Sequence, residues 1–235
     1  MAKIKTSALV ADIRGKVGGN VFSRNLGGAF VRVFTAPLNP QSSAQTVIRE
    51  RVAHLSTLWR TLVDSTRDAW NSAAANFPFE DVFGDTRFLS GQQLFMKFQS
   101  NLLAIGEDPV TDAPLPGALP SFDLVVPVHT VTNLDIEATG YQGPTADVSM
   151  IIRATRPLSP GRSNAYRADF KQIAVAPAAT VETGLSVTAS YEAVFGSLAG
   201  QIGQKIFFEA VPILENTGQA ASGVRSRGII LESAI

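Results

Sequence analysis

The first 36 residues constrain the fold most, because they alternate apolar and polar residues, cluster their glycines and hold no core of their own. The alternation predicts strands over Ser7–Arg14, Val17–Arg24 and Ala29–Thr35, with turns at Gly15-Lys16 and Asn25–Gly28. An isolated three-stranded meander has two open edges and little to bury, so it gains stability from another surface. We therefore interpret residues 1–36 as an extended β assembly arm.

The arm is strongly basic. Its six lysines and arginines face a single acid, Asp12, so its net charge is +5 in a chain whose 20 basic and 20 acidic residues balance. Cations of this kind steer a partner and set its register, whereas exposed phenylalanines supply retention by burying apolar surface. The predicted assembly interface is Arg14, Lys16, Phe22, Arg24, Phe30, Arg32 and Phe34.

Residues 37–106 predict a small helical platform. Asn39-Pro40 is a helix-start signal. The apolar stripe of the first helix follows at spacings of four and three: Ile48, Val52, Leu55, Trp59 and Leu62. Ser65-x-x-Asp68 resembles a capping box and predicts a second helix over Thr66–Asn76. We expect these two helices to form a hairpin with both tryptophans near its inner face.

A third helix and a change of composition follow. Ser90 caps the third helix, and Gly106 sits where its C-terminal stop belongs. Residues 107–120 hold four prolines in 14 residues, which is typical of a semi-rigid linker and marks a domain boundary.

After the linker the hydrophobic period changes to two, as in half-buried strands. Seven strands are predicted: Phe122–Val128, Asn133–Ala138, Ala146–Ala154, Phe170–Ala176, Ser186–Phe195, Lys205–Leu214 and Val224–Leu231. Seven antiparallel strands without cysteines favour a β-sandwich of the fibronectin type III or immunoglobulin-like kind over residues 121–235, with a short barrel as the alternative. The fold class expected for the whole chain is α+β and multidomain.

The sequence contains few residue patterns typical of catalytic or metal-binding sites. His54 and His129 are its only histidines, and it has no cysteine, so a zinc site has no ligand set. Gly15–Gly19 lacks the Walker spacing of a phosphate-binding loop. The acid pairs Glu80-Asp81 and Glu107-Asp108 are interpreted as solvated turn residues rather than as the carboxylate pair of a hydrolase. We expect a non-enzymatic protein without metal or cofactor. No signal peptide and no apolar run of ~18–20 residues is present, so we expect no membrane association.

Four segments in order resemble a family of proteins encoded in the structural-gene regions of tailed bacteriophages and prophages. The segments are RGKVGGNVFSRNLGGAFVR (Arg14–Arg32), APLNPQSSAQTVIRERV (Ala36–Val52), LWRTLVDSTRDAWNSAA (Leu58–Ala74) and SGQQLFMKFQSNLLAIG (Ser90–Gly106). Trp59, Leu62, Arg67 and Trp70 match the family's W-x-x-L-[TS]-x-x-x-R-x-x-W pattern, with Val63-Asp64 in place of the more typical Leu-Thr. The resemblance covers residues 1–106 and implies a virion component assembled in the host cytoplasm, without implying which part of the particle.

The leading hypothesis is a structural protein. Its arm would serve as the anchor, its platform as the base, its linker as the stalk and its sandwich as the display module. Its partners would be capsid, connector or tail subunits, in many copies, and a capsid-associated minor or decoration role is favoured over a tail or head–tail accessory role. A second hypothesis is a host-surface or carbohydrate-binding module that uses Tyr141, Arg156, Arg162, Asn164, Tyr166 and Arg167. A third is a DNA-contacting packaging or ejection protein, although the balanced net charge argues against nucleic acid.

Overall fold

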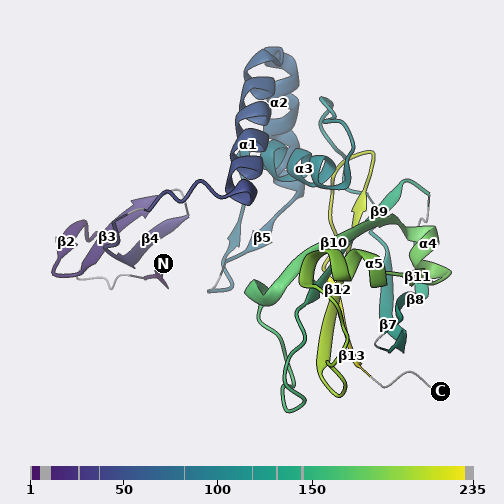
Figure 1. The fold of residues 1–235 in the computed structure, drawn as a ribbon. Coiled ribbons are helices and arrows are strands. Elements are labelled where there is room, and N and C mark those ends of the chain that lie inside the picture. The colour runs from purple at the N-terminus through teal and green to yellow at the C-terminus, as the bar shows by residue number, and fades with distance from the viewer. Residues whose placement is uncertain are drawn as a thin grey trace.

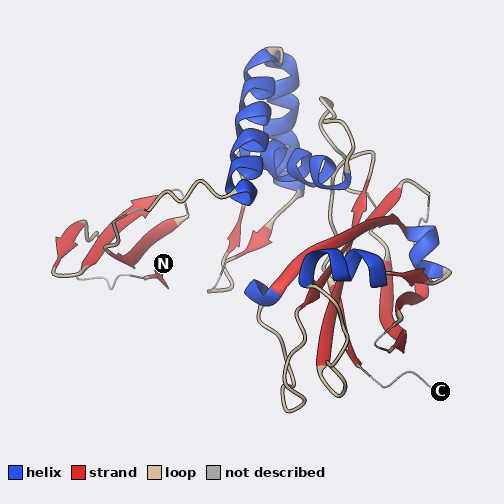
Figure 2. Ribbon diagram, viewed as in Figure 1, coloured by secondary structure: helices blue, strands red, loops and turns tan. Residues whose placement is uncertain are grey.

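The computed structural model describes residues 2–5, 12–25, 27–36, 38–81, 83–117, 119–130, 132–143 and 146–230. Within these residues, five α-helices combine with strands in four antiparallel sheets (Figures 1 and 2). The arm extends to one side, the helical platform (residues 37–106) stands in the middle, and the β-domain (residues 121–230) lies on the other side (Figure 1).

The arm is a four-stranded antiparallel sheet in the order β1-β4-β3-β2. Its strands are β1 (Ala2–Lys3), β2 (Gly15–Val17), β3 (Asn20–Asn25) and β4 (Gly28–Val33). Val17 pairs with Asn20, so Gly18-Gly19 forms a two-residue hairpin turn. Gly18 has a φ of 57°, the left-handed value that such turns require and that glycine adopts without strain.

This turn corrects the predicted strand boundaries. The predicted strand Val17–Arg24 divides between β2 and β3, and the predicted turn Gly15-Lys16 is part of β2. Most of the predicted strand Ser7–Arg14 lies outside the described residues, and its described end, Asp12–Arg14, is not a strand. Apolar alternation does not locate a turn, whereas a glycine pair does.

The helical platform is built from α1 (Ser43–Thr61), α2 (Asp64–Ala73) and α3 (Gly91–Ile105), and the 3₁₀ turn η1 (Ala74–Asn76) extends α2. Both α1 and α2 pack against α3. The Phe95 ring of α3 lies between the two tryptophans, 5.3 Å from Trp59 and 5.1 Å from Trp70 between ring centroids. Trp70 is fully buried as predicted, whereas Trp59 is half-buried.

Two of the predicted helix starts are wrong. Ser42 caps α1 by accepting a hydrogen bond from the backbone N–H of Gln45 (3.4 Å), and the left-handed φ of 47° at Gln41 prevents the helix from starting at Asn39. Helix α2 already begins at Asp64 without a side-chain cap, so the capping box proposed at Ser65 is absent.

The predicted ends of α3 are confirmed. Ser90 and Gln93 form a capping box, and Gly106 ends the helix in the left-handed conformation. Between α2 and α3, the aromatic segment forms a short hairpin of β5 (Phe79–Glu80) and β6 (Thr86–Arg87).

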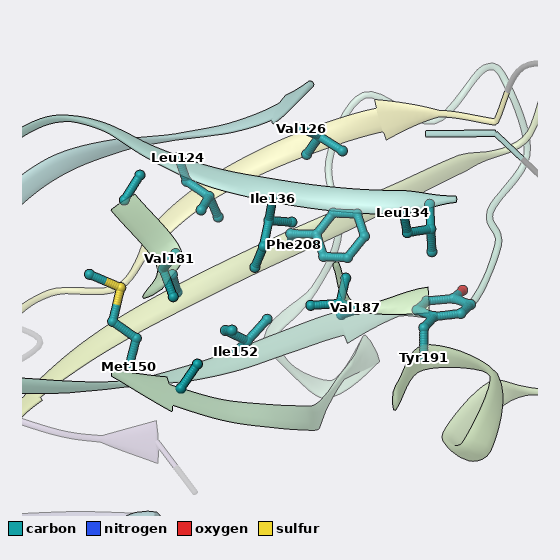
Figure 3. Packing of buried hydrophobic residues seen from close by; sticks show 14 of the residues in the cluster. Leu124, Val126, Leu134, Ile136, Met150, Ile152, Val181, Val187, Tyr191 and Phe208 are labelled. Atoms are coloured by element: carbon teal, nitrogen blue, oxygen red, sulfur yellow. The ribbon is translucent and has the colours of Figure 1, made fainter. Parts of the chain in front are cut away.

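The β-domain contains two antiparallel sheets, ordered β10-β9-β12-β13 and β11-β8-β7. The strands are β7 (Ser121–His129), β8 (Leu134–Gln142), β9 (Val148–Thr155), β10 (Phe170–Pro177), β11 (Leu185–Ser186), β12 (Lys205–Leu214) and β13 (Val224–Ile229). One core lies between the sheets, with Leu124 and Ile136 from one sheet and Met150, Ile152 and Phe208 from the other (Figure 3).

One predicted strand is a helix. Ser186–Phe195 contains the last residue of β11 and then α5 (Thr188–Phe195), and the short helix α4 (Ala178–Glu182) precedes β11. Tyr191 is buried in the core, where its hydroxyl donates to the Thr155 carbonyl oxygen (2.9 Å). Its ring packs on Phe195 one turn later, at 4.9 Å between centroids. The β-branched residues favour a strand locally, but this packing overrides them. The other six predicted strands are present; β12 has the predicted bounds, and the other five differ at one or both ends.

The linker is packed against the helical platform. The Trp70 indole N–H donates to the Thr111 carbonyl oxygen (2.8 Å). The side-chain oxygen of the buried Gln99 accepts from the backbone N–H of Val110 (2.7 Å). These two bonds hold residues 110–111 against α2 and α3, so this part of the linker is not a free stalk.

The platform also contacts the β-domain directly. Asn101 of α3 donates through its side-chain amide to the Gly218 carbonyl oxygen (2.8 Å). Gly218 has a φ of 75°, and a Cβ there would lie within 2.2 Å of the Phe98 carbonyl oxygen, so only glycine fits. The loop between β12 and β13 thus docks on α3.

Candidate assembly surface

The strand register separates the arm side chains onto two faces. Arg32 lies opposite Val21 and Val31 lies opposite Phe22, and side chains directly opposite each other share a face. We call one face the basic face; it carries Lys16, Val21, Phe30, Arg32 and Phe34. We call the other the apolar face; it carries Val17, Phe22, Arg24, Val31 and Val33.

The basic face combines cations with aromatic rings. The Lys16 ammonium lies 4.0 Å from the centroid of the Phe34 ring, within the range of a cation–π interaction. Phe34 is still 53% exposed, and Arg32 is exposed beside it. Phe30 is half-buried, and Lys3 of β1 lies opposite it. A partner on this face would meet positive charge around two phenylalanines.

The apolar face is uncovered. Val17 and Val33 are 69% and 68% exposed, and Phe22 and Val31 are half-buried. Across the described part of the arm whose accessibility is known, no side chain is buried. The arm sheet therefore has hydrogen-bonded strands but no core, as the sequence predicts.

The seven predicted interface residues do not form one surface. Lys16, Phe30, Arg32 and Phe34 lie together on the basic face, whereas Phe22 and Arg24 lie on the opposite face. Arg14 precedes β2 and pairs with its neighbour Asp12 at 2.7 Å. A single flat partner can cover only one of these groups.

The start of the arm is joined to the β5–β6 hairpin by ion pairs that the sequence did not predict. Lys3 Nζ lies 3.2 Å from Asp81 Oδ2, and Lys5 Nζ lies 3.1 Å from Asp85 Oδ2. Lys5 also lies 5.2 Å from the Phe83 ring centroid. We call these contacts the latch. Because about 80 residues separate the partners, no local sequence signal indicates the pairing.

Asp81 is the centre of the latch. Its side chain has no exposed area, and it also pairs with Arg87 at 3.4 Å, so its interpretation as a solvated turn acid is wrong. The backbone N–H of Phe83 donates to it (2.8 Å) and is the main cause that lowers its pKa; burial acts in the opposite direction, and Lys3 and the Asp85 N–H lower it further. The resulting pKa is about 2.

The first half of α1 presents a second uncovered apolar surface. Val47, Ile48 and Val52 are between 45% and 54% exposed. The predicted stripe therefore enters the core only from Leu55 onward, where α3 covers it. This exposed stretch begins about ten residues after the arm, in the helix that follows it.

The candidate surface-binding residues do not all lie in the same part of the β-domain. Five of them lie in the connection between β9 and β10, where Arg167 begins the 3₁₀ turn η2 (Arg167–Asp169): Arg156, Arg162, Asn164, Tyr166 and Arg167. Tyr141 lies on β8 in the other sheet, where it stacks on Phe122 at 6.0 Å between ring centroids. The loop is ordered by its own contacts: Arg162 pairs with Asp169 at 3.2 Å and lies 5.1 Å from the Tyr166 ring centroid.

The described residues contain no group of three or more histidine, aspartate or glutamate side chains arranged to hold a metal ion. His54 is exposed on α1, and the side chain of His129 lies outside the described part. Within the same described residues, no helix is both long and apolar enough to cross a membrane. Neither a protein-family model nor a curated protein sequence matches the chain.

Proposed function

We propose that this chain is a non-enzymatic structural component of a tailed-bacteriophage virion, anchored by its arm to neighbouring capsid, connector or tail subunits. The observation that carries the proposal is a sheet that exposes apolar side chains on both faces and has no buried side chain in its described part. Strands without a core gain stability when a neighbouring subunit covers them. The resemblance of residues 1–106 to proteins of phage structural-gene regions supports the same assignment.

We further propose that the β-domain is an immunoglobulin-like or fibronectin type III sandwich that the arm and platform display. The order β7-β8-β11 matches strands A-B-E of the immunoglobulin sandwich, and β9-β12-β13 matches strands C-F-G. The fourth strand, β10, pairs with β9 rather than with β11, which is a change from the constant-type arrangement. The shared core between the two sheets supports a sandwich over an open sheet.

Within the particle, we favour a capsid-associated minor or decoration protein over a tail or head–tail accessory protein. A weak contact repeated on a symmetric shell retains a protein through multivalency, which suits an arm with a small surface. Quantitative mass spectrometry of purified virions separates the two roles. Hundreds of copies per particle would support the shell, and about six or twelve would support the connector or tail.

The two faces of the arm allow a sharper test of anchoring. Alanine at Phe30 and Phe34 removes apolar area from the basic face, and alanine at Phe22 removes it from the apolar face. If the arm is the anchor, at least one of these variants is lost from particles even at low ionic strength, because apolar burial supplies roughly 25 cal/mol per Å². The matched control is glutamine at Arg14, Lys16, Arg24 and Arg32, which should weaken incorporation less. Wild-type incorporation of a variant with alanine at Phe22, Phe30 and Phe34 together would contradict anchoring by the arm.

A further inference from the structure

The outer face of the sheet β10-β9-β12-β13 carries a pocket that none of the preceding proposals uses. On β12, Phe208 points into the core, so the neighbouring Phe207 faces the other side of the sheet. The pocket has a volume of about 380 Å³, within the range of small-molecule sites. It is lined by Phe170 and Phe207, by Arg225, Ser226 and Arg227 of β13, and by Ser163 and Asn164 of the β9–β10 loop.

The loop that forms one wall is fixed to the sheet. Leu158 and Ala165 are buried with Phe207 in a small separate cluster. Leu158 and Lys205 exchange two backbone hydrogen bonds of 2.9 Å, and the Lys205 ammonium donates to the Arg162 carbonyl oxygen (3.1 Å). The wall is therefore preformed, which lowers the ordering cost of binding.

One arginine of the pocket is held in a fixed position. Arg225 donates from Nε to Glu209 Oε1 (2.8 Å), and its guanidinium lies 4.9 Å from the Phe170 ring centroid. Glu209 is 7% exposed and also accepts from Arg153 Nη1 (3.0 Å). Burial opposes ionisation of Glu209, but the bonds from Arg225 and Arg153 outweigh it and hold its pKa below the usual range. The carboxylate thus stays charged and keeps Arg225 in place.

The pocket has surplus positive charge. The single carboxylate of Glu209 pairs with both Arg153 and Arg225, and Arg227 adds a further positive charge to the pocket lining. Arg227 is exposed and forms no ion pair with any residue in the described part of the chain, and the Nη atoms of Arg225 likewise have no hydrogen-bond partner there. Two N–H groups along one edge of a guanidinium can bind the two oxygens of a carboxylate.

We propose that this pocket binds an acidic sugar unit. Its carboxylate would pair with Arg225 and Arg227, its hydroxyls would bond Ser163 and Asn164, and an apolar ring face would contact Phe170 and Phe207. The charged, polar and aromatic side chains that face the pocket then each have a partner of matching chemistry. The proposal does not depend on anchoring by the arm, and it replaces the dispersed candidate set that included Tyr141.

The test is a titration of the full chain with D-glucuronate, followed through the backbone amide signals of Ser163, Asn164, Ser226 and Arg227. Glucose supplies the ring without the carboxylate, and acetate supplies the carboxylate without the ring. We expect glucuronate to bind at least tenfold more tightly than either. Equal binding of acetate, or no binding of glucuronate, would overturn the proposal.

Two variants localise the site. Arg227→Gln removes an exposed side chain that has no ion pair with the described residues, so the fold should be unchanged and the affinity for glucuronate should fall about tenfold or more. Arg167→Gln removes an exposed arginine of the same loop region that does not line the pocket, and the affinity should stay the same. Unchanged affinity in Arg227→Gln, or an equal loss in both variants, would contradict the assignment.

Discussion

At the scale of single residues, the helical platform depends on aromatic contacts around Phe95. Trp70 meets its ring edge-on, with an angle of 85° between the planes, and Trp59 meets it at 52°. Aromatic pairs of this geometry contribute beyond the area they bury. Trp70 also bonds the linker through its indole N–H, so this side chain joins α2, α3 and the linker.

We therefore expect Trp70→Ala to lower the free energy of unfolding by about 3–5 kcal/mol, the range for large aromatic truncations in a core. Trp59→Ala should cost less, because Trp59 is only half-buried. Urea denaturation of both variants measures the difference. An equal or larger loss for Trp59→Ala would contradict the packing described here.

The pKa of Asp81 gives the latch a defined pH dependence. Its folded pKa of about 2 lies below the ordinary 3.8, so ionised Asp81 stabilises the folded protein fully above about pH 4, first through the Phe83 N–H and then through Lys3, and this contribution is lost as the pH falls towards 2. Stability measured between pH 2 and 5 should fall less steeply in Asp81→Asn than in the wild type. Identical slopes would show that Asp81 titrates as an ordinary exposed acid.

At the scale of elements, the arm meets the rest of the described chain mainly through charged groups. The Lys5–Asp85 pair is exposed, so salt should screen it, since the Debye length falls from about 10 Å at 0.1 M to about 3 Å at 1 M. Exposed ion pairs of this kind contribute little individually. The latch is thus a contact that a partner could displace.

We expect Lys3→Gln combined with Lys5→Gln to raise amide exchange in β1 and in residues 79–87, while exchange in β9 and β12 stays unchanged. High salt should have the same effect on the wild type. Lys171→Gln, which removes a lysine without an ion pair in the described chain, is the control and should change neither segment. Full protection of β1 and residues 79–87 in the double variant would contradict a latch of this kind.

Elements were predictable where the signal is local. The Ser90 cap and Gly106 stop of α3 are adjacent in sequence to the groups they satisfy, so both ends were predicted. The Lys3–Asp81 pair, the docking of Gly218 on α3 and the helix at Thr188–Phe195 depend on contacts between distant residues. Local propensity does not contain that information, and for α5 it favoured the wrong element.

The candidate sites, too, were predictable only where the sequence signal is local. The sequence predicted the composition of the arm surface, because strand alternation and glycine turns are local. It did not predict how those residues divide between two faces, because the register depends on the turn at Gly18-Gly19. The acidic-sugar pocket includes Asn164, which was a candidate, but Arg225 and Arg227 come from a strand about 60 residues further along the chain.

At the scale of the whole molecule, charge is divided between the arm and the rest. The arm carries +5, and residues 37–235, with 14 basic and 19 acidic residues, carry −5. The arm projects away from the platform and β-domain, which have their own cores (Figure 1). Removal of the arm should therefore leave the remainder folded.

Anchoring by the arm is tested by the copy number of arm-deleted protein (residues 37–235) in purified particles, measured by quantitative mass spectrometry beside the full chain. Circular dichroism of the purified variant serves as the control for folding. We expect a folded protein that is absent from the particles. Incorporation at the wild-type copy number would contradict anchoring by the arm and would assign attachment to the platform or the β-domain.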